Sequence, residues 1–241
     1  MLDQVQRIQQ QALDGRRRPQ PEEGPLAVLY EDAAVLVVSK PSGIVVHPTY
    51  KNSSGTLLNA VLWRYRGHTE VQPGILTRLD KDTSGIVAIA LTPRLHATMQ
   101  KDMAAGRVIK EYLAVVTGTP DPPKGRIALP LGRSSADRRI VVVRDDGQHC
   151  VTDYEVIAVH DDLTLLRCEL HTGRTHQIRV HLATKGWPVL GDRVYASPSE
   201  RIARQALHAW RLTFPHPVTR ELVTLTAPLP PDVAALVAAP P

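Results

Sequence analysis

A carboxylate and a guanidinium stand two positions apart in residues 74–90, where a polar loop leads into an apolar run. Asp80 follows Arg78, residues 81–85 are turn-forming, and residues 86–91 are almost all apolar and β-forming. Such a run predicts a buried strand. Because a carboxylate is costly to bury without a cation, we expect Asp80 to have a cationic partner.

Several chemistries fit the residue types of this loop. In the simplest, Asp80 or Asp82 only hydrogen-bonds the backbone of a polar turn. A calcium loop would need a bidentate glutamate at its twelfth position, which is Leu91, so the sequence excludes it. A phosphatase-like Asp-x-Asp nucleophile would need a parallel α/β core and a magnesium site, and Arg78 would neutralise that site.

Composition narrows the class of partner. The chain has 241 residues, a formal net charge of +5 and an isoelectric point near 9.4, which favours a polyanionic partner. One Phe among ten aromatic residues argues against a surface that binds single strands by stacking. No apolar run approaches the ~20 residues of a membrane span. The two cysteines, Cys150 and Cys168, suit a reducing compartment, so we expect a cytoplasmic protein. We expect no membrane contact and take a monomer as the default.

The elements that position these residues follow from periodicity and capping signals. Strands often succeed one another directly, which predicts an α+β fold with a mixed, largely antiparallel sheet. Residues 1–25 predict a flexible basic arm, and residues 26–241 predict one globular domain, which the resemblance described below implies to be a catalytic domain. Strands are expected at 27–30, 35–38, 86–91, 108–118, 139–143, 151–159, 163–170, 207–214 and 221–226, and helices at 55–66, 92–106, 171–183 and 232–237.

Four motifs occur in a fixed order: Lys40-Pro-Ser-Gly43, Arg78-Leu-Asp80, Lys110-x-Tyr112, and the run from Thr172 to His181, which reads TGRTHQIRVH. Gly191-Asp192 and Tyr195 follow them. With these motifs, residues 26–230 resemble the RluA-type family of RNA pseudouridine synthases. The resemblance implies a long mixed sheet with peripheral helices and an active cleft across its middle. It also implies conversion of uridine to pseudouridine in large-subunit ribosomal RNA, tRNA or both, without cofactor or metal.

The resemblance assigns roles to three residues in catalysis. Asp80 matches the catalytic aspartate, Arg179 matches the arginine that pairs with it, and Tyr112 matches the tyrosine that stacks on the target base and takes the C5 proton. Direct attack of the aspartate on the sugar and a route through a glycal both fit these residues. An arginine beside the carboxylate would keep it ionised and fix its direction.

Five further residues are expected to contact the substrate. Arg78 matches the residue that fills the stack after the uridine is flipped out, and Ile178 would be an apolar wall of the base pocket. Thr77 stands where relatives usually carry His, which predicts altered RNA contacts and retained chemistry. Lys40 and His176 complete the expected set.

Two alternatives remain at this point. A zinc site could use His171, His176 and His181, but their five-residue spacing sends successive imidazoles to different sides of a helix, so we expect no metal. A catalytically inactive RNA-binding protein with the same fold is the other alternative. The presence of Asp80, Tyr112 and Arg179 together argues against it.

Overall fold

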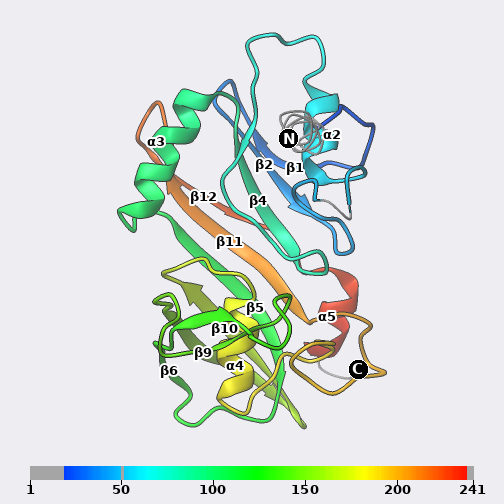
Figure 1. Cartoon of the computed structure of the whole chain (residues 1–241), viewed down its shortest axis with the longest axis vertical. Helices are drawn as coiled ribbons and strands as arrows, with labels where there is room; N and C mark the ends of the chain where they lie inside the picture. Colours follow the sequence, from blue (N-terminus) through cyan, green and yellow to red (C-terminus); the bar gives the residue numbers. More distant parts are fainter. Residues whose placement is uncertain (1–18, 50–51, 238–241) are drawn as a thin grey trace, which may run out of the picture.

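The computed structural model describes residues 19–49 and 52–237. Its elements follow the predicted α+β succession closely (Figure 1). In chain order they are β1 (Ala27–Glu31), β2 (Val35–Lys40), α2 (Leu57–Arg64), β3 (Gly74–Ile75), β4 (Ser84–Ala90), α3 (Pro93–Ala104), β5 (Ile109–Thr117), β6 (Lys124–Ile127), β7 (Leu131–Arg133), β8 (Val141–Val143), β9 (Thr152–His160), β10 (Leu163–Leu170), α4 (Gln177–Thr184), β11 (Leu207–Pro215), β12 (Leu222–Thr226) and α5 (Pro231–Val237).

One ten-stranded mixed sheet carries the fold. Its main path is β1-β2-β4-β11-β5-β10-β9-β6, with β12 beside β11 and β3 beside β4. Strands β4 and β11 run parallel, and the other strand pairs within the described residues are antiparallel. The predicted fold class is therefore confirmed. Figure 1 shows β1, β2, β4 and α2 in one half of the molecule and β5, β9, β10 and α4 in the other, with β11 between them.

The two halves meet along a very short parallel contact. Only two residue pairs, His208 with Ser84 and Ala209 with Gly85, join β11 to β4. Gly85 has φ +113°, and a Cβ there would lie 2.2 Å from the Ala209 carbonyl oxygen, so no other residue fits. The Ser84 hydroxyl and His208 Nδ1, both buried, are hydrogen-bonded at 2.9 Å.

Strands β2 and β4 are buried on both faces, as the apolar run at 86–91 predicts. Alternate residues of β2 pack against α3 on one face and against α2 on the other. Thr56 is the N-cap of helix α2, and its hydroxyl accepts a hydrogen bond from the Asn59 amide. Helix α3 begins with Thr92 as N-cap and Pro93 in its first turn.

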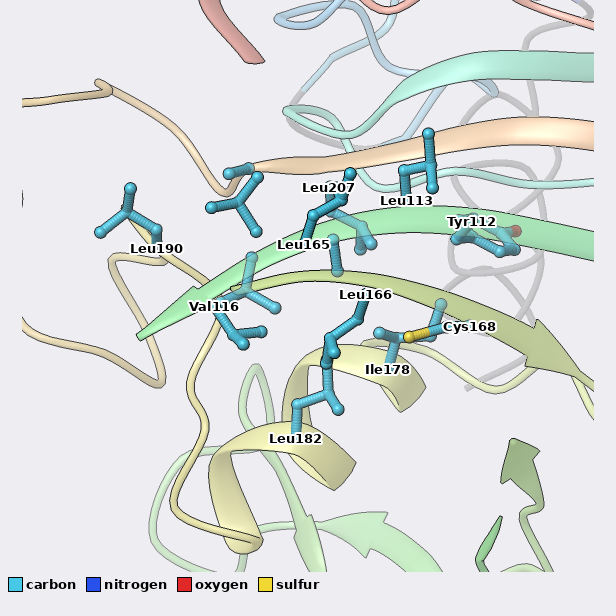
Figure 2. Packing of buried hydrophobic residues seen from close by; sticks show 14 of the residues in the cluster. Tyr112, Leu113, Val116, Leu165, Leu166, Cys168, Ile178, Leu182, Leu190 and Leu207 are labelled. Carbon is cyan, nitrogen blue, oxygen red and sulfur yellow. The ribbon is translucent and has the colours of Figure 1, made fainter. Parts of the chain in front are cut away.

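The other half is built around β5, β10 and α4. Figure 2 shows Tyr112 on β5, with Ile178 and Leu182 of α4 packed beneath Leu166 and Cys168 of β10. Cys150 and Cys168 are buried free thiols. In the described ranges, no helix is both long and apolar enough to cross a membrane.

The structure corrects three local expectations. Helix α4 begins at Gln177 and not at 171, because the preceding His176 takes a left-handed conformation (φ 56°). Strands β3, β6 and β7 are short and lie in segments where no strand was predicted. Residues 20–22, predicted to belong to the flexible arm, contact α2: Asn59 Nδ2 donates to the Gln20 carbonyl at 2.7 Å. The rest of the predicted arm, residues 1–18, lies outside the described part of the chain.

Candidate active site

A cavity of about 470 Å³ opens where the two halves of the sheet meet. Its walls come from the loop between β3 and β4, from α3, from β5, and from α4 with the loop before it. Seven of the eight predicted site residues line it, and Lys40 is the exception. A concave site of a few hundred Å³ is the usual size for a pocket that encloses a small ligand.

Lys40 lies behind the site and not in it. Its side chain is only 1% exposed, and its ammonium donates to the carbonyl oxygens of Pro41 (2.7 Å), Ile44 (2.8 Å) and Lys81 (2.9 Å). These three bonds occupy all three of its protons. The expected contact between Lys40 and the substrate stays a prediction, while in the structure its ammonium holds the loop that follows Asp80.

The same loop is tied down from the opposite side by the chain before β11. Arg204 donates to the Asp82 carbonyl at 3.2 Å, and Gln205 Nε2 donates to the Thr83 hydroxyl at 3.2 Å. Arg204 is itself fixed by a bidentate pair with Asp232 of α5, at 2.7 and 2.8 Å. The backbone around Asp80 is therefore held by residues from β2, from the segment before β11 and from α5.

Asp80 has the cationic partner that its position requires. Arg179 Nη1 donates to Asp80 Oδ2 at 2.8 Å, from the first turn of α4, 99 residues away along the chain. The other edge of the same guanidinium pairs with Asp192, through Nε at 2.6 Å and Nη2 at 2.8 Å. Exposure falls from 26% for the Asp80 side chain to 6% for Arg179 and 0% for Asp192. The accessible end of this chain of ion pairs is Asp80.

Asp192 fixes the orientation of Arg179. Burial alone would raise the pKa of Asp192, but its hydrogen bonds to Arg179 and the charge of that guanidinium outweigh burial and lower the pKa below its ordinary value. The backbone amides of Val194 (2.9 Å) and Tyr195 (3.2 Å) also donate to its Oδ1. One arginine therefore lies between two carboxyl groups, and Asp80 is the carboxyl group at the open end of the cluster.

Tyr112 and Ile178 form apolar surface beside Asp80. Tyr112 is 7% exposed and Ile178 is 3% exposed, and both line the cavity. Burial, and then the charge of Asp80, raise the pKa of Tyr112 well above its usual value of 10, so it is a neutral phenol near pH 7. Within the described residues its hydroxyl has no hydrogen-bond partner, so it is free to meet a ligand.

His176 also faces Asp80, from the residue that precedes α4. Its Nε2 is 3.8 Å from Asp80 Oδ2, and its Nδ1 is 2.9 Å from the Tyr195 hydroxyl. Burial is the main cause that lowers the pKa of His176 below 6.5, and the charge of Asp80 only partly opposes it. The ring is therefore neutral at pH 7, and Arg179 remains the cation that compensates Asp80.

Thr77 and Arg78, which come just before Asp80 in the sequence, line the cavity. The Thr77 hydroxyl, 8% exposed, accepts a hydrogen bond from the Ala88 amide at 3.0 Å and so extends the pairing along β4. Arg78 is exposed and has no ion-pair partner in the described part of the chain. It lines both the cavity and an adjoining groove of about 370 Å³ that also includes Arg133 and Arg174.

The three histidines considered for zinc have separate partners. His171 contacts Asp153, His176 contacts Tyr195, and His181 contacts Thr152 and the Leu129 carbonyl. No group of three or more His, Cys, Asp and Glu side chains, within residues 19–49 and 52–237, is arranged to hold a metal ion.

Sequence reasoning missed the residues that support the site. Asp192 was part of a motif but received no role, and Arg204 and Gln205 were not singled out. A buried aspartate must be paired, so Asp192, which follows a glycine in a loop, could have been proposed as a second partner of Arg179.

The comparison with protein families decides the assignment. The model of the family described as RNA pseudouridylate synthase matches residues 34–184. The chain belongs to this family. The matched segment contains β2 to α4 and therefore Asp80, Tyr112 and Arg179, while Asp192 and β11 lie beyond it.

Relatives and solved structures agree with this assignment. The chain is 42% identical over 218 residues to the "Uncharacterized RNA pseudouridine synthase YlyB" of Bacillus subtilis, covering 88% of this chain and 72% of that one. It is 40% identical over 245 residues to the "Ribosomal large subunit pseudouridine synthase D" of Xanthomonas campestris, covering 95% and 74%. The structure of "Human RNA Pseudouridylate Synthase Domain Containing 1" superposes with a TM-score of 0.72 at 27% identity, covering 89% of each chain. Enzymes with these names are isomerases that act on RNA.

Proposed function

We propose that this chain isomerises a uridine of large-subunit ribosomal RNA to pseudouridine, with Asp80 as the catalytic carboxylate. The observation that carries the proposal is the chain of ion pairs Asp80–Arg179–Asp192, whose exposed end is a carboxylate in a cavity next to Tyr112 and Ile178. The choice of ribosomal RNA is supported by relatives 38–40% identical that are named ribosomal large subunit pseudouridine synthase D.

The reaction exchanges one bond of the sugar for another. The bond between C1′ and N1 breaks, the uracil turns, C1′ joins C5, and the proton of C5 is lost while N1 gains one, so nothing is added or removed. A fixed carboxylate suits this chemistry, because it can bond to the sugar or stabilise positive charge as the glycosidic bond breaks. Arg179 holds that carboxylate in place and Asp192 holds Arg179.

The uracil must be kept in place while it is detached. The Tyr112 ring and the Ile178 side chain provide a rigid apolar surface for a planar base. Because Tyr112 is a neutral phenol, we assign it to contact with the base and to hydrogen bonding through its free hydroxyl. For Tyr112 to take the C5 proton, its phenol would first have to lose its own proton. The expectation that Tyr112 is the base therefore requires a second group that accepts the phenol proton.

The uridine must leave its RNA stack to enter the cavity. Arg78 and Arg174 are exposed, have no ion-pair partners in the described ranges, and line the cavity and its adjoining groove. We assign them to the RNA around the flipped nucleotide. An arginine can pair with phosphate or stack its plane on a base, so Arg78 suits the space that the uridine vacates.

The test is release of tritium from RNA labelled at uracil C5. Transcripts of large-subunit ribosomal RNA and of tRNA are offered separately to the wild-type chain and to Asp80→Asn. Release from the ribosomal transcript that disappears in the variant supports both the reaction and the nucleophile. Release from tRNA alone changes the substrate, equal release by both proteins removes Asp80 from the mechanism, and binding without any release favours a catalytically inactive RNA-binding protein.

A further inference from the structure

Lys110 is a buried cation that the proposed mechanism does not use. It lies near the start of β5, two residues before Tyr112, so both side chains point to the same face of the sheet. It is 8% exposed and lines the cavity that contains Asp80. Its ammonium is close to the loop before α4, since a Cβ built at Gly173 would be 3.6 Å from Lys110 Nζ.

No acidic residue of the described chain compensates this cation. The neighbouring Glu111 points to the other face, where it accepts bonds from Arg211 at 2.6 and 3.0 Å and from Arg167 at 3.3 Å. Burial lowers the pKa of Lys110, and no carboxylate opposes that shift. Lys40, by comparison, is 1% exposed and has three carbonyl acceptors. The Lys110 side chain is mostly buried, but its ammonium has no protein acceptor within the described residues and faces the cavity, so it is available to a ligand.

We propose that Lys110 binds a phosphate of the flipped uridine, an inference that rests on the proposed function. A lysine presents three donors on a compact charge, which suits a phosphate oxygen better than the neutral uracil ring. Lys110 is placed toward the end of β5 where Ile109 is 40% exposed, while Tyr112 lies further along the strand. The backbone of the nucleotide therefore meets Lys110, and its base extends toward Tyr112 and Ile178.

The position of Gly173 supports this assignment. Because residue 173 has no side chain, the space beside the ammonium stays open toward the exposed loop of residues 173–175. A phosphate held there would lie between Lys110 and Arg174, which also lines the cavity. Lys110 would then fix how far the nucleotide enters, and so where its sugar lies relative to Asp80.

The experiment measures RNA binding without turnover, using the full chain with Asp80→Asn. A large-subunit ribosomal RNA transcript is titrated at a series of KCl concentrations against chains that also carry Lys110→Met, Lys110→Arg or the control Lys124→Met, an exposed lysine on the distant edge strand β6. We expect Lys110→Met to weaken binding about tenfold and to reduce the log–log salt slope by about one, and Lys110→Arg to retain most binding. Lys124→Met should leave both quantities almost unchanged.

Thermal unfolding of the same chains separates this role from a structural one. If Lys110 serves the ligand, Lys110→Met melts at the same or a higher temperature, because an uncompensated buried charge has been removed. A lower melting temperature with unchanged RNA binding would overturn the inference. Lys110→Met can also be placed in the chain that keeps Asp80, so that turnover is measured. If Lys110→Met lowers kcat there but leaves binding and salt slope unchanged, the inference is overturned and the ammonium is assigned to the departing uracil.

Failure of the proposed function gives a different result. A wild-type chain that releases no tritium, but whose binding and salt slope still depend on Lys110, would refute the isomerase activity and leave the phosphate contact intact.

Discussion

The cationic side chains on the interior side of the cavity and those at its mouth differ in whether the protein supplies acceptors for them. On the interior side, Arg179, Arg204 and Lys40 each have two or three acceptors before any RNA arrives. At the mouth, Arg78 and Arg174 have no ion-pair partners in the part of the chain that is described. The three interior cations hold the site together, and the two arginines at the mouth are available to bind a polyanion.

This difference separates two kinds of functional residue by what their loss should change. Removing a compensated interior charge strands its partner in a low-dielectric environment, so stability and chemistry should fall together. Removing an uncompensated charge at the mouth should affect RNA affinity alone. Three of the four predictions below test this division, and the other tests the junction between the two halves of the sheet.

The largest effect is expected for Asp80→Asn. The amide keeps the size of the side chain and can still contact Arg179, but it cannot act as a nucleophile or carry the negative charge. We expect tritium release to fall by about 10³-fold or more while RNA binding changes little. A variant that loses affinity in proportion to activity would place Asp80 among the binding residues.

Asp192→Asn should weaken the site through Arg179, without changing a residue that faces the cavity. Arg179 would lose a buried ionic partner, so we expect the free energy of unfolding to fall by roughly 3–5 kcal/mol and activity to fall with it. The control is Asp146→Asn, whose side chain is 70% exposed and pairs with Arg144. Its loss should change the free energy of unfolding in urea only slightly, because exposed ion pairs contribute little to stability. Equal costs for the two variants would contradict the division drawn above.

A pH-dependent effect is expected at the junction of β4 and β11. Burial lowers the pKa of His208 from 6.5 to about 4. The unfolded chain therefore takes up a proton at His208 between these values and the folded chain does not, so stability falls as the pH is lowered through this window. We expect this residue to contribute about 2 kcal/mol of that loss between pH 7 and pH 5.

His208→Gln provides the comparison for that measurement. The glutamine cannot titrate, so urea unfolding of the variant should lose less stability over the same pH range, whatever its absolute stability. Parallel pH profiles for the two chains would show that His208 is not the group responsible.

The smallest effect is expected for Arg78→Ala at the mouth. Since Arg78 has no ion-pair partner in residues 19–49 and 52–237, its loss should leave the melting temperature unchanged. RNA affinity should fall severalfold, with a shallower salt dependence. Arg94→Ala, an exposed arginine on α3 outside the cavity, is the matched control. A fall in melting temperature for Arg78→Ala alone would move Arg78 to the interior class.

The sequence predicted those parts of the fold and site that leave a local or motif-level signal. The apolar run at residues 86–91 indicated a buried strand, and periodicity with capping signals indicated helices at residues 55–66 and 92–106. Asp80 had to have a cation, and the family resemblance selected Arg179 from 99 residues away. These predictions succeeded because burial of apolar surface and the cost of an unpaired charge act in any fold.

The remaining features depend on tertiary contacts that no local pattern encodes. Lys40 belongs to a site motif, but its ammonium is bonded to two carbonyl oxygens of the loop after β2 and to the Lys81 carbonyl, so it does not line the cavity. Helix α4 starts late because His176 adopts a left-handed conformation beside Tyr195. The strands β3 and β6 are short and derive their order from the neighbours they pair with.

The place of β11 in the sheet has a consequence for how the protein is made. Strands β4 and β5 follow one another along the sequence, but in the sheet β11 lies between them. Strand β11 begins at Leu207 and is therefore synthesised long after β5, which ends at Thr117. A nascent chain that ends before residue 207 contains Asp80 and Tyr112 but lacks the strand that joins the two halves of the sheet. Because such long-range pairing is slow to form, Asp80 and Tyr112 reach their positions in the cavity only after β11 has been synthesised.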